Sequence, residues 1–321
     1  LYGEYVYLAI HRSTDGGATA NFICNGIADG AGPPPRYCNG SSEANFIAPF
    51  VLDPNNSSRM YGGAKRLWVS TNVKAATPTW AIARAQAANR DSNVTTHPYW
   101  TYISAVAVAP GNSDVMYVGH NDGRVFKTIN ATAVTPTWTE LTCAFPAYPV
   151  FFRQVLRLVI EPTNSNIVYA GHGGYDTANL WKLDSTGATT CTSIGSGLPP
   201  SPVRAIARHP TAPNWLYAGT EVGLFASENL GSIWKTASDG PANVSVEELV
   251  WQNGNTLIAA THGRGMFKAV VGTAPVCAYA VTPAPVAAPA AGSTVSVDIS
   301  AALASCAWAA SSATAWVTPA A

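Results

Sequence analysis

Carboxylates gather in the polar segments that separate the short apolar runs of this chain. Asp122, Asp176 and Glu221 each follow such a run. Two carboxylates about 5–9.5 Å apart can cleave a glycosidic bond by acid–base or nucleophilic chemistry. The sequence does not fix the distance between them, so they are catalytic candidates only if the chain is a hydrolase. It contains no serine elbow, phosphate-binding loop or dinucleotide fingerprint in a suitable context.

These segments, and a second set of polar segments along the chain, carry aromatic, histidine and arginine side chains that suit a carbohydrate or peptide ligand. Ring faces can cover the apolar sides of a sugar while polar groups fix its orientation. The predicted ligand-binding residues are His97, Tyr99, Trp100, His120, Asp122, Tyr148, Arg153, His172, Tyr175, His262 and Arg264. Two alternatives stay open: the histidines cap strand ends, and the aromatic segments pack between repeats or form an interface.

An internal repeat predicts the elements that position these residues. Four stretches share an alternating apolar run, a proline turn and a short run that ends in Tyr-X-Gly. The repeated residues are Pro54, Pro110, Pro162 and Pro210, and Tyr61, Tyr117, Tyr169 and Tyr217. Alternation with period 2 and turns every 8–12 residues predict antiparallel strands. Four short strands repeated about every 50 residues are typical of β-propeller blades. The predicted fold class is therefore all-β.

A polar turn before the fourth strand of each repeat resembles the Asp-box, Ser-X-Asp-X-Gly-X-X-Trp. The matching residues are Ser13, Asp15 and Gly17 in one copy, and Ser227, Asn229, Gly231 and Trp234 in another. The resemblance is to BNR, sialidase-like, sortilin-like and xyloglucanase-like propellers. We expect a structural role for the turn, because the short side chain binds backbone N–H groups and Gly takes a positive φ. A functional site is then expected on the opposite face, at the loops between the second and third strands and at the loops that join a fourth strand to the first strand of the next blade.

Residues 1–271 are predicted to form the propeller, with six or seven blades. Residues 1–25 read as the last two strands of one blade and residues 246–270 as three strands of another. Either these ends combine into one closing blade, or further blades precede residue 1.

From residue 272 the composition shifts to Ala, Pro, Ser, Thr and Val. This tail resembles the BACON family of Ig-like β-sandwich modules. The matching residues are Cys277, Val281, Pro283, Gly292, Val295, Val297, Cys306, Trp308 and Trp316. Residues 272–321 are thus predicted to be a partial sandwich; a spacer is the alternative.

Cysteine pattern and charge favour an extracellular, secreted or cell-surface protein. The six cysteines form three pairs in sequence order, and these predict the disulfides Cys24–Cys38, Cys143–Cys191 and Cys277–Cys306. Glycosylation candidates are Asn39, Asn55, Asn56, Asn93, Asn130 and Asn243. Eighteen basic residues balance 18 acidic ones, which gives no footprint for nucleic acid. No apolar run is long enough to span a membrane, and no ligand spacing predicts a metal or cofactor.

These observations favour a non-catalytic binding or assembly scaffold whose ligand is a polysaccharide or a surface protein. One alternative is a self-assembling subunit of an extracellular filament or sheath. The other is a glycoside hydrolase of the sialidase or xyloglucanase type, which leaves enzymatic activity undecided.

Overall fold

The computed structural model describes residues 1–30, 38, 40–88, 98–142, 153–236, 240–272, 279–282, 289–301, 309, 311–312 and 317–319. The chain forms two compact units, Leu1–Val271 and Gly272–Ala321. Across these residues the regular structure is β, apart from one 3₁₀ turn, η1 (Pro98–Thr101). None of the described segments forms a helix with the length and apolar character that a membrane span requires.

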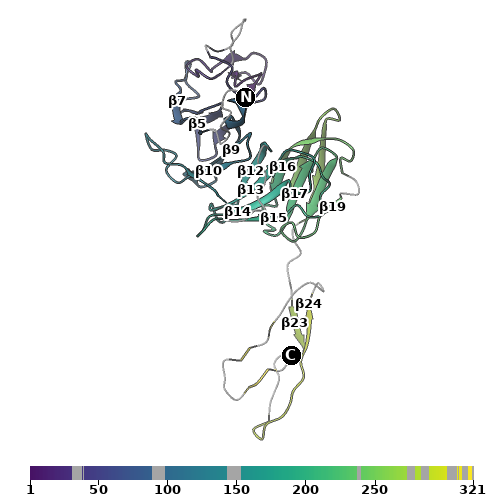
Figure 1. Ribbon diagram of the computed structural model, residues 1–321. Coiled ribbons are helices and arrows are strands. Elements are labelled where there is room, and N and C mark those ends of the chain that lie inside the picture. Colours follow the sequence, from purple (N-terminus) through teal and green to yellow (C-terminus); the bar gives the residue numbers. More distant parts are fainter. Residues whose placement is uncertain are drawn as a thin grey trace. The chain divides into compact units, whose positions relative to one another are not determined.

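Six antiparallel sheets follow one another along the first unit and make a six-bladed β-propeller (Figure 1). We number the blades in chain order. Blade 1 is β1 (Tyr2–Glu4), β2 (Ile10–Arg12) and β3 (Asn21–Phe22). Blade 2 is β4 (Phe50–Asp53), β5 (Asn56–Gly63), β6 (Leu67–Ser70) and β7 (Ala81–Arg84). Blade 3 is β8 (Ile103–Ala109), β9 (Asn112–His120), β10 (Val125–Thr128) and β11 (Thr139–Glu140).

The remaining three blades repeat this pattern. Blade 4 is β12 (Val155–Ile160), β13 (Ile167–His172), β14 (Leu180–Asp184) and β15 (Thr190–Ser193). Blade 5 is β16 (Val203–Arg208), β17 (Leu216–Thr220), β18 (Gly223–Ser227) and β19 (Lys235–Thr236). Blade 6 is β20 (Val246–Gln252), β21 (Thr256–Thr261) and β22 (Met266–Val270). The all-β propeller prediction is thus confirmed.

The glycine of each Tyr-X-Gly motif lets the next blade approach. A Cβ on Gly63 would lie 2.7 Å from Ile103 Cγ2, and one on Gly119 would lie 2.5 Å from Val155 Cγ1. The equivalent distances are 2.5 Å from Gly171 to the Val203 carbonyl oxygen and 2.7 Å from Gly219 to Val246 Cγ1. In blades 3 to 6 we call the first strand the inner strand. The residue at its start thus fills the space that a side chain on the glycine of the preceding blade would need. The glycines recur because blades recur, and this contact fixes the spacing between them.

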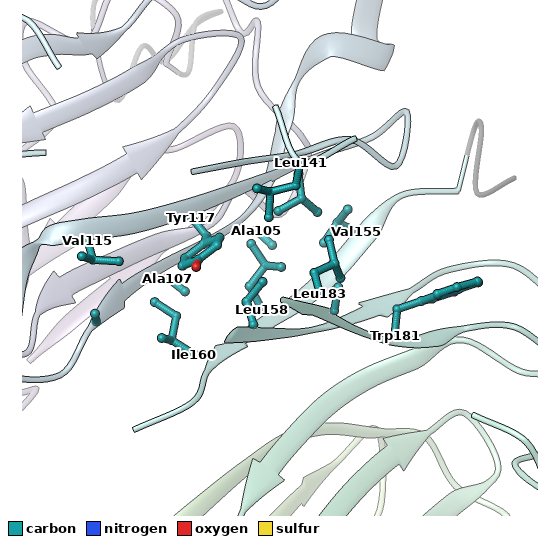
Figure 2. Close-up of a cluster of buried hydrophobic side chains, with 14 residues drawn as sticks. Ala105, Ala107, Val115, Tyr117, Leu141, Val155, Leu158, Ile160, Trp181 and Leu183 are labelled. Carbon is teal, nitrogen blue, oxygen red and sulfur yellow. The ribbon is translucent and has the colours of Figure 1, made fainter. Parts of the chain in front are cut away.

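Apolar side chains fill the layers between blades. Figure 2 shows the layer between blades 3 and 4, where Tyr117 and Ala105 face Leu158, Val155 and Leu183. Tyr117 is fully buried, and its hydroxyl donates to the Ser165 carbonyl of the next blade at 2.8 Å. A blade has two apolar faces, so stacking the blades buries both.

Hydrogen bonds within the turns between third and fourth strands define one face of the propeller. Ser227 Oγ accepts from the Gly231 amide at 2.9 Å, and Asn229 Oδ1 accepts from the Ile233 amide at 2.9 Å. The Trp234 indole then donates to the Ile194 carbonyl of the preceding blade at 2.7 Å. Ser13 and Asp15 make the corresponding contacts with Gly17 and Thr19.

The two ends of the propeller form separate sheets. Blade 1 contains three strands where the sequence predicted two, because Tyr2–Glu4 pairs with Ile10–Arg12. Blade 6 contains the three strands that were expected. The alternative in which both ends combine into one closing blade is therefore wrong.

The second unit contains the antiparallel pair β23 (Tyr279–Thr282) and β24 (Asp298–Ala301). This pair does not make a sandwich, so the BACON-like module stays a prediction. Trp308, Trp316, Cys277 and Cys306 lie outside the described residues.

The Cys24–Cys38 disulfide is present as predicted. Cys191 is disulfide-bonded as well, and its expected partner Cys143 lies outside the described residues.

Candidate functional site

Bulges recur where the inner strands of blades 3 to 6 begin. The pairing register shifts between Ile103 and Ala105, and between the corresponding residues of β12, β16 and β20. A bulge leaves one residue unpaired and re-aims its side chain. In blades 5 and 6 the extra residue is charged: it is Arg204 in β16 and Glu247 in β20.

These charged residues meet a loop that the sequence singled out. Arg204 forms ion pairs with Glu221 and, at 3.6 Å, with Glu247. The Tyr175 hydroxyl donates to Glu221 Oε2 at 2.6 Å, while the tyrosine itself is 75% exposed. The Arg204 guanidinium thus contacts two carboxylates, and one of these also accepts a hydrogen bond from an exposed tyrosine.

Two further ion pairs extend this group. Arg157 of β12 pairs with Glu248 of β20 and donates to the Arg204 carbonyl at 3.2 Å, so its side chain links the inner strands of three blades. Arg153 pairs with Asp176, next to Tyr175. We call these eight residues the arginine–carboxylate cluster; they are Arg153, Arg157, Tyr175, Asp176, Arg204, Glu221, Glu247 and Glu248.

The contacts within the cluster keep two of its carboxylates, Asp176 and Glu221, ionised. Burial alone would raise the pKa of Glu221, but the hydrogen bonds from Tyr175 and Arg204 outweigh it and lower that pKa. The Thr177 amide and Arg153 lower the pKa of Asp176. The Glu221 hydrogen bond in turn raises the pKa of Tyr175 and keeps its hydroxyl protonated. Neither carboxyl therefore holds a proton to give away at neutral pH.

The structure brings four of the predicted residues into the cluster and leaves others elsewhere. Arg153, Tyr175, Asp176 and Glu221 lie together. Asp122 belongs to blade 3, where it is buried and pairs with Arg124 at 2.6 Å. The three carboxylates proposed for hydrolysis therefore do not all belong to the cluster. His97 and Tyr148 lie outside the described residues.

His120 and His172 are fully buried. Arg84 donates to His120 Nε2 at 3.0 Å, so the proton sits on Nδ1 and is donated to the Thr101 carbonyl. Burial lowers the pKa of each histidine to about 3, and a nearby arginine adds to the effect. These side chains support the strand ends and offer no surface to a ligand.

Tyr99, His262 and Arg264 are exposed, and Trp100 is partly buried. Tyr99 and Trp100 stack edge to face on η1. Arg264 donates to the Ala242 carbonyl at 3.2 Å. In the part of the chain that the structure describes, no group of three or more His, Cys, Asp or Glu residues could hold a metal ion.

Sequence reasoning missed Arg157, Arg204, Glu247 and Glu248 because they lie within strands. A signal was available: each is a charged residue near the start of a first strand whose counterparts in blade 3 are Ser104 and Ala105. A charged residue at a strand position that is uncharged in another repeat indicates that its side chain has a polar or charged partner.

The glycosylation candidates differ in whether the side-chain amide nitrogen is held by a hydrogen bond or the residue is exposed. The Asn55 Nδ2 donates to the Ala109 carbonyl of blade 3 at 2.9 Å, and a glycan on that nitrogen would break this contact. Asn56 and Asn243 are exposed. Asn39 and Asn93 lie outside the described residues.

Comparisons with known proteins find similarity in fold only. No family model and no curated protein matches the chain. An ancestral GH74 enzyme matches with a TM-score of 0.48 and 18% identity, over 66% of this chain and 27% of its own. A chain of the mitotic checkpoint complex matches with a TM-score of 0.48 and 16% identity, over 68% of this chain and 62% of its own. The computationally designed Ika4 protein matches with a TM-score of 0.37 and 16% identity, over 53% of this chain and 91% of its own. This chain thus spans less than a third of the GH74 enzyme, and such weak similarities carry no argument about function.

Proposed function

We propose that the protein is an extracellular, non-catalytic scaffold that binds a neutral polysaccharide at the arginine–carboxylate cluster. The observation that carries the proposal is the exposed Tyr175, whose hydroxyl is hydrogen-bonded to Glu221, the ion-pair partner of Arg204. Sugar rings pack on aromatic faces, and their hydroxyls both donate and accept hydrogen bonds. Ionised carboxylates accept and guanidinium groups donate, so the cluster complements both roles.

The charge of the cluster favours a neutral ligand. Three arginines stand against four carboxylates, and every arginine in the cluster already has a carboxylate partner. An anionic sugar would have to displace one of these partners. Partly exposed ion pairs contribute only about 0–1 kcal/mol each to stability. The small stabilisation by these ion pairs therefore gives little structural reason for several of them to lie together.

Hydrolysis is the second candidate, and one observation favours it. Glu221 and Glu247 contact the same guanidinium, which keeps them within the roughly 9.5 Å limit for paired catalytic carboxylates. A general acid, however, needs a raised pKa, and that of Glu221 is lowered. Binding without cleavage therefore fits the cluster better.

Affinity electrophoresis through gels that contain neutral or acidic polysaccharides tests the proposal. We expect at least one neutral polysaccharide to retard the protein. Tyr175→Ala should weaken this retardation by up to about tenfold, because it removes a ring contact worth about 0.5–1.5 kcal/mol. Tyr5→Ala is the matched control, since Tyr5 is also exposed but lies outside the cluster.

Retardation by acidic polysaccharides alone, or equal loss in both variants, would contradict the proposed site. Release of reducing ends by the wild type that Glu247→Gln abolishes would replace binding with hydrolysis.

A further inference from the structure

The outer edge of blade 6 differs from that of every other blade. In blades 2 to 5 a fourth strand pairs with the third, and in blade 1 β3 pairs with β2 in the same way. Blade 6 ends at β22, and within the described ranges no strand pairs with its outer edge. Met266 and Val270 are 77% and 72% exposed. An unpaired strand edge is a template for another extended chain.

The repeat fixes the register at this edge. Phe267 pairs with Ala259, as Trp68 pairs with Gly62 in blade 2. Lys268 therefore occupies the position of Val69, whose partner on the fourth strand is Ala81. A chain added to β22 would place one residue opposite Lys268 and the next opposite Phe267.

The turn that leads into the fourth strand of blade 5 has no counterpart in the residues that end β22. In blade 5 the turn that leads into it uses Ser227 and Asn229, whose side chains bind the backbone. By the same register blade 6 has Ala269 and Val271 at these positions, and neither can make those bonds. Blade 6 thus lacks the side-chain bonds that shape this turn, and among the described residues its outer edge is unpaired.

The β22 edge and the fourth strands of the other blades indicate which side chains a segment that pairs with β22 should carry. Fourth strands in blades 2, 3 and 5 are preceded by Trp80, Trp138 and Trp234, and the indoles of Trp80 and Trp234 donate to carbonyls of the preceding blade at 2.7 Å. Lys268 has no ion-pair partner among the described residues. If β22 strands of two copies paired antiparallel in a centred register, the two Lys268 side chains would lie opposite each other. The repulsion between like charges would disfavour this pairing.

We propose that β22 is a docking edge for an extended peptide segment of another protein. The segment pairs antiparallel with β22 and carries an aromatic residue followed by an acidic residue opposite Lys268. Main-chain hydrogen bonds supply affinity, and the aromatic and acidic side chains supply specificity.

Fluorescence anisotropy with labelled peptides tests this proposal. The parent peptide copies residues 77–84 of this chain, Thr-Pro-Thr-Trp-Ala-Ile-Ala-Arg, which already forms a fourth strand in blade 2. We expect its Ala81→Glu form to bind the full-length protein two- to fivefold more tightly than its Ala81→Lys form. Lys268→Glu in the protein should reverse that order. N-methylation of the peptide backbone should abolish binding of either form.

Hydrogen exchange should then show protection of Met266–Val270 when the peptide binds. Binding that survives N-methylation, ignores Lys268→Glu or protects a different strand would overturn the proposal. Concentration-dependent dimers that protect β22 without peptide would assign the edge to a second copy and would overturn it as well. Because Lys268 lies outside the arginine–carboxylate cluster, failure here leaves polysaccharide binding untouched.

Discussion

Replacing Gly171 with alanine is expected to lower the free energy of unfolding by about 3 kcal/mol. A Cβ at this position would lie 2.5 Å from the Val203 carbonyl oxygen of the next blade. The obstacle is backbone, so no side-chain rotation relieves the overlap, and the two blades must separate. Overpacking of this kind destabilises proteins by about 1–3 kcal/mol, and a backbone obstacle belongs at the upper end. Urea unfolding followed by tryptophan fluorescence measures the change.

Gly187→Ala is the control for this substitution. No atom lies within 4 Å of a Cβ at Gly187, so its stability should stay within about 0.5 kcal/mol of wild type. If Gly171→Ala is equally neutral, the Tyr-X-Gly motif does not set the spacing between blades.

Lowering the pH from 7.5 to 5 is expected to remove about 4 kcal/mol of stability through two buried histidines. Burial lowers the pKa of His120 and of His172 from 6.5 to about 3. Above pH 6.5 both states hold them neutral, so there is no effect. Below that value the histidines of the unfolded chain bind protons while those of the folded chain stay neutral. The free energy of unfolding therefore falls until about pH 3. At pH 5 each histidine accounts for about 2 kcal/mol.

Carboxylates with lowered pKa values, such as Asp176 and Glu221, add their own loss only below their ordinary values of 3.8 and 4.5. A measurement at pH 5 therefore keeps the contribution of these two carboxylates small. His120→Gln should remove about half of the difference between the two pH values, and His262→Gln, at an exposed site, should remove none. A wild-type protein that is equally stable at both pH values would show that the histidines are not buried in the neutral form.

The fold was predictable because its information is local and repeated. Proline turns and Tyr-X-Gly motifs mark hairpins, and hairpin strands pair with their neighbours in sequence. The same motif also contains the contact between blades, since each glycine receives the first residue of the next inner strand. The end blades were harder, because Tyr2–Glu4 lies in a single copy of the pattern and has no aligned partner to reveal it as a strand.

The site was less predictable because its contacts are distant in sequence. Arg157 and Glu248 are 91 residues apart, and only the packing of blades 4 to 6 brings them together. The histidines show the opposite error. Each follows a Tyr-X-Gly motif and reads as a loop residue, but it still pairs in the sheet, as His172 does with Val155. Its side chain consequently points into the packed layer instead of the solvent.

Hydrogen exchange of the protein with and without a retarding neutral polysaccharide tests the proposed site most directly. We expect protection of residues 173–179 and 221–222, the loops that carry Tyr175, Asp176 and Glu221. We expect no change at residues 13–20 and 228–234, the turns on the opposite face. Protection of those turns with unchanged loops would show that the polysaccharide binds the opposite face and would contradict the proposed site.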